Sequence, residues 1–364
     1  MKKVLGMILL LACFVSCHAA PKLVYNGDTL EWNYSWKKQQ CGTLDIQKNI
    51  IEVSGIACSR VTPGYIWMQS DETVKYIIAT TEKGDERACK VKFNKSIRWD
   101  WEDMSGGVYN DTNYLFIGAF GDNDETDGEY SVVWFEEPAI DPENAPEVTV
   151  TPNRIKYVYP DGKKHNNEAL MYDNRTSEIY IITKVYYDVC QVFRLPFRTD
   201  YGDEVQTLEY ICDLGVRSDL GEGSKPYKGF HLVTAADISP DGKYILIKNH
   251  NNIVATYCWV LYWVRQDGES VAEAIQRQPQ PIRAYNTYEW QGEAICWLDD
   301  DTFYTTSDAD DGNPPIYKFT RKWGEDIEET QTDEAAANKL VMIDNTLYVR
   351  SADHLYSLDG RKVQ

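Results

Sequence analysis

The sequence predicts an all-β chain folded as a β-propeller, with six blades as the count that best fits its repeats. The first observation is a recurring short phrase, in which a polar and usually acidic residue stands just before an apolar strand. The second is the spacing of the phrases, and the third is the series of short strands that follows each of them. The phrases are Val53-Ser54-Gly55-Ile56, Trp101-Glu102-Asp103-Met104, Asn167-Glu168-Ala169-Leu170, Ala235-Ala236-Asp237-Ile238 and Gly292-Glu293-Ala294-Ile295.

The spacing of the phrases is that of propeller blades. When they are aligned on their last residue, which is always apolar, successive copies lie 48, 66, 68 and 57 residues apart. A four-stranded blade with loops of variable length occupies intervals of this size. The repeats run through the chain, which favours one domain with many small cores over two average domains.

Short aromatic and β-branched runs follow each phrase and predict the remaining strands. Second strands are expected at residues 65–68, 114–117, 179–182, 244–247 and 303–306, and third strands at 130–135, 191–195, 257–264 and 316–320. Turn signals such as Asp161-Gly162 and Asp241-Gly242 separate these runs. Helical periodicity is limited to connections, at residues 270–277 and 332–339.

The two ends of the chain decide the blade count. Residues 340–343, 346–350 and 354–358 supply three strands, and residues 43–53 offer the missing outer strand. Strands from both ends would then close a six-bladed ring and leave no open edge, with five or seven blades as alternatives. In a competing interpretation, residues 355–363 resemble the end of Bacteroidetes secretion-sorting tails, which removes the sixth blade or gives it two roles.

The N-terminus predicts export. Lys2 and Lys3 precede an apolar stretch at residues 4–15 and then small residues, the pattern of a secretory signal peptide. We therefore expect a signal peptide at 1–19, an N-terminal segment at 20–42 and a single propeller domain at 43–364. Alternatively, residues 14–17 form a loose lipoprotein box in which Cys17 is acylated. The expected locations are the periplasm, the outer membrane as a lipoprotein, or the cell surface.

Charge and cysteine content limit the partners. The formal charge is −20, and −22 without Lys2 and Lys3, so we expect no nucleic acid partner, and a membrane only through a lipid on Cys17. The seven cysteines after the signal peptide are an odd number without zinc spacing. We interpret them as buried small hydrophobic residues with one or two disulfides. The expected state is a monomer that takes a small-molecule or glycan ligand at its axial face.

Propeller geometry predicts that carboxylates and basic residues from distant segments meet at one face. The first strand of a blade starts, and the second strand ends, at the same end of the axis. The residues placed there are Glu102, Asp103, Glu168, Asp237 and Glu293 from first-strand starts, and Asp71, Asp122, Lys184, Lys248, Asp308 and Arg350 from second-strand ends.

So many carboxylates around a narrow axis repel one another unless a cation or protons intervene. All the acidic residues of this set are oxygen donors, which favours Ca²⁺ over Mg²⁺ because Ca²⁺ accepts about 6–8 irregularly placed oxygens. Lys184, Lys248 and Arg350 would neutralise negative charge on a substrate, and His165 or His231, near the same face, could act as a general base. A structural account stays open, in which the carboxylates cap backbone amides and pair with the lysines.

Several segments together resemble an uncharacterised family of secreted bacterial β-propeller proteins, over residues 52–317. The motifs are Glu52-Val53-Ser54-Gly55-Ile56, Asp100-Trp101-Glu102-Asp103, Phe120-Gly121-Asp122-Asn123, Glu168-Ala169-Leu170, Thr234-Ala235-Ala236-Asp237-Ile238-Ser239-Pro240-Asp241-Gly242 and Gln291-Gly292-Glu293-Ala294-Ile295. This resemblance implies the fold and the motif positions rather than a reaction. Ser54 and Ala236 depart from the pattern, because they stand where other blades have Glu.

More distantly, the axial carboxylates look like those of calcium-dependent propeller hydrolases of the phytase-like and lactonase-like groups. The first functional hypothesis is therefore a calcium-dependent hydrolase of phosphate esters or lactones. The alternative is a non-enzymatic cell-surface propeller that binds a glycan or a protein and holds a structural calcium. Serine-hydrolase, kinase and nicotinamide motifs are absent from the sequence.

Overall fold

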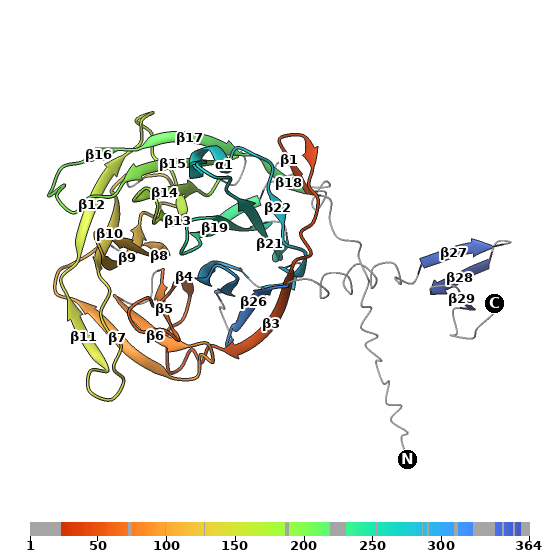
Figure 1. Ribbon diagram of the computed structural model, residues 1–364, viewed down its shortest axis with the longest axis horizontal. Helices are drawn as coiled ribbons and strands as arrows, with labels where there is room; N and C mark the ends of the chain where they lie inside the picture. Colours follow the sequence, from red (N-terminus) through yellow and green to blue (C-terminus); the bar gives the residue numbers. More distant parts are fainter. Residues whose placement is uncertain are drawn as a thin grey trace, which may run out of the picture.

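The computed structural model describes residues 23–71, 75–98, 100–126, 128–185, 189–218, 231–251, 254–285, 287–289, 291–308, 312–322, 339–343, 346–351 and 354–357. The predicted signal peptide and Cys17 lie outside these residues. The described strands form five blades arranged around a central axis (Figure 1). The chain is thus an all-β propeller, as the repeats predict.

The first three blades are meanders in which the strand order runs from the axis to the rim. The first blade contains β4 (Val53–Cys58), β5 (Tyr65–Ser70), β6 (Tyr76–Thr81) and β7 (Arg87–Phe93). The second contains β8 (Trp101–Tyr109), β9 (Thr112–Ala119), β10 (Tyr130–Glu136) and β12 (Asn153–Val158). The third contains β13 (Asn167–Asp173), β14 (Glu178–Thr183), β15 (Cys190–Pro196) and β17 (Glu209–Leu214).

The last two blades follow the same plan with different outer strands. The fourth contains β19 (His231–Ile238), β20 (Tyr244–Asn251), β21 (Val254–Val264) and the short β22 (Gln280–Pro281) and β23 (Thr287–Tyr288). The fifth contains β24 (Ala294–Asp299), β25 (Thr302–Thr306), β26 (Pro315–Arg321) and β3 (Trp36–Thr43). An N-terminal segment therefore forms the outer strand of the fifth blade, but it precedes the segment 43–53 that the sequence suggested.

Two outer strands cross from one blade to its neighbour. β11 (Glu147–Val150) follows the second-blade strand β10 in the chain, yet it pairs in parallel with β7 of the first blade. β16 (Gln206–Thr207) follows the third-blade strand β15, yet it pairs in parallel with β12 of the second blade. In Figure 1 both lie at the rim of the ring. Adjacent blades are therefore joined by backbone hydrogen bonds as well as by packing.

The prediction of six blades is wrong. The C-terminal strands β27 (Lys339–Ile343), β28 (Thr346–Ser351) and β29 (His354–Ser357) form a sheet of their own, drawn apart from the ring in Figure 1. A further small sheet contains β1 (Leu23–Tyr25), β2 (Asp28–Thr29) and β18 (Val216–Ser218). The pairings of the described strands do not show the expected closure by strands from both ends of the chain.

The hydrophobic cores explain why five blades suffice. Five clusters of buried side chains lie between successive blades, and the fifth packs the first blade directly against the last. In that fifth cluster Ile56 and Met68 of the first blade meet Ala294 and Tyr304 of the fifth. A sixth blade would have to separate these apolar faces, which already exclude water by contacting each other.

Free thiols and short helices complete the description. The seven cysteines of the described chain are free, and five of them are buried. The Sγ atoms of Cys58 and Cys296 lie 3.4 Å apart between the first and fifth blades. The helices are α1 (Val271–Ala274), capped by Ser270 within the segment expected to be helical, and η1 (Arg283–Tyr285). No helix in the described part of the chain is long and apolar enough to cross a membrane.

Candidate functional site

β-bulges shape the starts of the inner strands. The pairing register with the second strand shifts at residues 53–55 in β4, 101–104 in β8, 167–169 in β13 and 233–235 in β19. A bulge re-aims the side chain of the extra residue, and bulges are frequent beside active sites. The side chains concerned include those of Ser54, Glu102, Glu168 and Thr234, while Glu293 immediately precedes the regular pairing of β24.

Three of these residues and one lysine form what we call the mouth cluster: Glu102, Glu168, Glu293 and Lys184. They come from the second, third and fifth blades, and all four are buried. Lys184 Nζ lies 3.0 Å from Glu168 Oε1, directly beyond the end of β14. Electrostatic coupling of Glu293 to Lys184 and Glu168 spans the ring, because the third and fifth blades are not neighbours. The structure therefore brings these four residues of three blades together near the central axis.

Burial and mutual repulsion raise the pKa values of two carboxyl groups in the mouth cluster. Burial, followed by repulsion from Glu168, raises the pKa of Glu102 well above its usual range. Burial raises the pKa of Glu293 to about 8, although Lys184 favours its ionised form. A carboxyl group with the pKa of Glu293 carries a proton near neutral pH, and perturbed groups of this kind concentrate at functional sites.

The rim of the mouth cluster is also acidic. Asp71 and Asp308, which follow second strands as predicted, are half-buried and repel the ionised form of Glu293. Asp100, likewise half-buried, repels that of Glu102. Gly121 lies against the cluster, because a Cβ atom at this position would collide with Oε1 of Glu102. The glycine of the Phe120-Gly121-Asp122-Asn123 motif thus lets the backbone pass over a buried carboxyl group.

Asp103 is a structural residue of the channel interior. Its Oδ2 accepts hydrogen bonds from the backbone N–H groups of Leu170 (2.9 Å) and Ala236 (3.0 Å), and its Oδ1 accepts one from Met104 (2.8 Å). The side chain is fully buried, and burial raises its pKa. The innermost strand of each blade has no neighbouring strand on its axial edge, so its backbone N–H groups there need other acceptors. The carboxylate of Asp103 accepts from such N–H groups in two other blades.

Asp237 plays a similar structural part. Its Oδ2 accepts from the backbone N–H of Trp297 at 2.8 Å, and its Oδ1 accepts from the hydroxyl of Ser105 at 3.1 Å. Burial raises the pKa of Asp237 to about 6. The bulge in β19 makes Thr234, rather than Asp237, the counterpart of Glu168. Asp237 therefore lies deeper along the axis than the phrase alignment implies.

Lys248 belongs to a second ion pair, sealed from solvent. Its Nζ lies 2.9 Å from Oε2 of Glu289, and both side chains are 0% exposed. The ammonium also donates to the carbonyls of Ala294 (3.2 Å) and Thr306 (2.8 Å). A Cβ atom on Gly292 would come within 2.9 Å of Lys248 Cε, so the glycine of the fifth phrase makes room for this pair.

The remaining candidates are Asp122, His165, His231 and Arg350. Asp122 caps its own loop by accepting from the N–H of Thr126 (2.9 Å) and the hydroxyl of Tyr130 (2.8 Å). His165 pairs with Asp161 at 3.1 Å. His231 and Arg350 fall in β19 and β28, but their side chains lie outside the described part of the structure.

Sequence reasoning missed Glu289, which contributes one half of the sealed pair. It stands outside the repeated phrase, in a connection that carries no strand pattern. The only available signal was an acidic residue three positions before the fifth phrase, at a distance that no other blade repeats.

The fit of a metal ion can be tested on the donors. Within the described ranges, no three or more His, Cys, Asp or Glu side chains are grouped so that they could hold a metal ion. Glu168 already has a positive charge beside it in Lys184. Calcium binding therefore stays a prediction.

Two solved structures resemble the chain in their fold. A candidate 6-phosphogluconolactonase of Bacteroides uniformis is 10% identical, with 85% of this chain and 83% of that chain covered at a TM-score of 0.32. A gluconolactonase of Xanthomonas campestris is 8% identical, with 84% and 96% covered at a TM-score of 0.40. Values this low carry no argument about the site. Comparisons with protein-family models and with curated proteins found no match.

Proposed function

We propose that the protein is a hydrolase whose mouth cluster cleaves an ester by general acid–base catalysis. The observation that carries the proposal is the position of Glu293, which is buried and interacts electrostatically with the Glu168–Lys184 ion pair, and whose pKa is raised by burial to about 8. Neighbouring carboxyl groups whose environments favour different protonation states can serve as acid and base in one reaction. We therefore assign the role of the acid to Glu293 and the role of the base to Glu168, which is ion-paired to Lys184.

The reaction adds one water molecule across a carbon–oxygen bond. Glu168 takes a proton from the water as its oxygen attacks the substrate carbonyl, and Lys184 attracts the negative charge that develops on the carbonyl oxygen. Glu293 then gives its proton to the departing ester oxygen. Solvent water returns the proton from Glu168 to Glu293, so the cycle consumes only substrate and water.

The charge of the rim favours a neutral substrate. Asp71, Asp100 and Asp308 surround the mouth cluster, and the whole chain carries a formal charge of −20. A phosphate ester would approach against this negative potential, whereas a lactone carries no charge. Within the two predicted substrate classes, we therefore propose lactones before phosphate esters.

The test is hydrolysis of δ-valerolactone and of 4-nitrophenyl phosphate by the purified protein. Glu293→Gln keeps the shape and neutrality of the protonated side chain but removes its transferable proton. We expect a loss of kcat of about 10²- to 10⁴-fold. Glu143→Gln, an exposed carboxyl group far from the cluster, is the matched control. Equal activity of the two variants would refute the acid role, and a folded protein without turnover would favour the glycan- or protein-binding alternative.

Export and calcium binding are proposed on the sequence alone. The basic and apolar residues at positions 2–15 support export, and N-terminal sequencing of the mature protein tests it. The number of carboxylates around the axis supports calcium. Elemental analysis together with thermal melts in EDTA and in Ca²⁺ tests this ion, because a ligand that binds only the folded state raises Tm. A metal-free sample without a shift in Tm would exclude it.

A further inference from the structure

A polar cavity of about 380 Å³ lies on the outer part of the second blade, away from the mouth cluster. Its walls come from β10, β12 and two connections, residues 95–98 before β8 and 198–203 after β15. No residue of the mouth cluster lines it. Its volume falls within the range of small-ligand sites.

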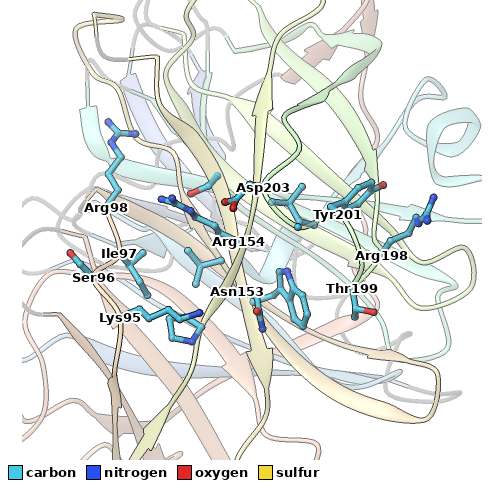
Figure 2. A pocket seen from close by; sticks show the side chains of 16 residues that line it. Lys95, Ser96, Ile97, Arg98, Asn153, Arg154, Arg198, Thr199, Tyr201 and Asp203 are labelled. Carbon is cyan, nitrogen blue, oxygen red and sulfur yellow. The ribbon is translucent and has the colours of Figure 1, made fainter.

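The charged side chains that line this cavity are mostly basic, whereas the chain as a whole is acidic. Four cationic side chains line it, those of Lys95, Arg98, Arg154 and Arg198, against the single carboxylate of Asp203, although Arg198 is already paired with Asp200 at 2.8 Å. Figure 2 shows Arg154 between Arg98 on one side and Arg198 on the other. The chain as a whole has 57 acidic and 37 basic residues, so this concentration of positive charge is local. Such a patch attracts anions even on an acidic protein.

Two of the cations are available to a ligand. Across the described residues, neither Lys95 nor Arg154 has an ion pair or a side-chain hydrogen bond, and both are exposed. Arg98 is instead anchored, because its guanidinium donates to the backbone carbonyls of Glu129 (2.6 Å) and Gly121 (3.1 Å). Asp203 lies 3.5 Å from Lys156, so the one lining carboxylate already has a partner.

A second cavity extends the first into a groove. It measures about 260 Å³, shares Arg98, Ser131 and Arg154 with the first, and continues to Lys156. Arg154 therefore belongs to both cavities. A single small anion would fill only one of them, whereas a chain with spaced anionic groups could contact Lys95 and Arg154 in turn.

The walls also offer apolar surface. Trp134 and Tyr201 line the first cavity, and Tyr157 and Val158 line the second. Aromatic side chains pack well against the apolar faces of sugar rings while a polar edge stays hydrated. Nucleic acid would bring its high charge density close to a chain with a net charge of −20, which opposes binding.

We propose that this groove binds an anionic oligosaccharide. The carboxylate or sulfate groups of the sugar pair with Arg154 and Lys95, and its ring faces pack against Trp134 and Tyr201. This proposal does not depend on the hydrolase reaction, because the groove and the mouth cluster share no residue.

The experiment is titration calorimetry of the full chain with tetragalacturonate and with heparin tetrasaccharide. Maltotetraose, inorganic sulfate and a short DNA duplex are the comparison ligands. We expect heat from at least one anionic tetrasaccharide, a weaker affinity at higher salt, and no binding of maltotetraose.

Arg154→Glu should weaken binding about tenfold or more, since it replaces a charge-assisted hydrogen bond by repulsion. Lys37→Glu is the matched control, because this exposed lysine on β3 of the fifth blade undergoes the same change of charge. Both positions are exposed, and equal melting curves establish equal folding.

Four results would overturn the proposal: binding of no tetrasaccharide, equal loss in both variants, sulfate binding as tightly as the tetrasaccharides, or preference for DNA over both sugars.

Discussion

Two lysine–glutamate pairs have nearly the same geometry but different surroundings. Lys184 and Glu168 lie 3.0 Å apart and Lys248 and Glu289 lie 2.9 Å apart. The first pair is 9% and 4% exposed, and further carboxyl groups surround it. The second pair is 0% exposed, and the carbonyls of Ala294 and Thr306 and the hydroxyl of Thr305 are among its further hydrogen-bond partners.

The difference distinguishes a pair with a structural role, Lys248–Glu289, from a mouth cluster whose protonation suits chemistry. In the sealed pair each charge is matched, so neither group is free to exchange a proton or a ligand. Within the mouth cluster one cation serves three carboxyl groups, and a proton on Glu293 reduces the excess negative charge. An imbalance of this kind lowers the stability of the fold, and proteins retain such destabilising features mainly at functional sites.

Lys248→Met should have the largest effect. It leaves the Glu289 carboxylate fully buried without its cation, which costs about 3–5 kcal/mol of the free energy of unfolding. Urea denaturation measures the loss, with Lys37→Met as the surface control. Adding Glu289→Gln to Lys248→Met should restore part of the stability. A loss below about 1 kcal/mol for the single variant would mean that the pair does not carry its charges.

The pH dependence of stability should come next. The folded-state pKa of Glu293 is about 8, against 4.5 for an unperturbed glutamate, so the folded chain holds this proton more tightly than the unfolded chain. Its contribution is complete below about pH 4.5 and is lost as the pH rises through about 8, at up to about 1.4 kcal/mol per pH unit. The corresponding contribution of Asp237 to stability is lost as the pH rises through its folded-state pKa of about 6.

Urea midpoints between pH 6 and 8 therefore isolate Glu293 from Asp237. The midpoint of the parent protein should fall with rising pH, and Glu293→Gln should flatten this fall because glutamine has no proton to lose. Glu143→Gln should follow the parent curve. Identical slopes for the parent and Glu293→Gln would show that Glu293 is not protonated at the mouth cluster.

Lys184→Met should cost less than Lys248→Met, about 1–3 kcal/mol, the penalty of a buried polar group that loses its partner. The loss should be larger at pH 8 than at pH 5, since a proton can take the place of the lysine charge when the solution is acidic. Thermal melts at the two pH values measure it. A cost equal to that of Lys248→Met at both values would erase the contrast between the pairs.

The smallest effect is expected at a surface pair. Lys92 and Glu147 join β7 to β11, and their side chains are 47% and 48% exposed. Because water screens exposed pairs, Lys92→Met should leave the urea midpoint unchanged within error. A clear shift would indicate that the strand exchange between blades depends on this contact.

Sequence periodicity predicted the propeller fold and part of the candidate site. Glu102, Glu168, Glu293 and Lys184 meet because first strands start, and second strands end, at one end of every blade. The same rule misplaced Asp103 and Asp237, whose carboxylates turn to backbone N–H groups of other blades. Those donors become visible only when the inner edges of the strands face one another.

The blade count and the basic groove needed the folded chain. The strand patterns of β27–β29 look like those of a blade, and only the packing of Ile56 and Met68 on Ala294 and Tyr304 shows that the ring is already complete. The groove combines Lys95, Arg154 and Arg198 from three separate segments. Residues 87–98 contain five basic residues and no acidic one, but nothing in the sequence indicates that Arg154 and Arg198 join them.

The pairing of β3 with β26 has a consequence for biosynthesis. Trp36 pairs with Arg321, so a strand made at the start of translation finds its partner only when the fifth blade has been made. In the meantime its edge could pair with other chains. Its polar run, Lys37-Lys38-Gln39-Gln40, opposes such pairing. The time that the ribosome takes to make the last blade sets how long this edge stays unpaired.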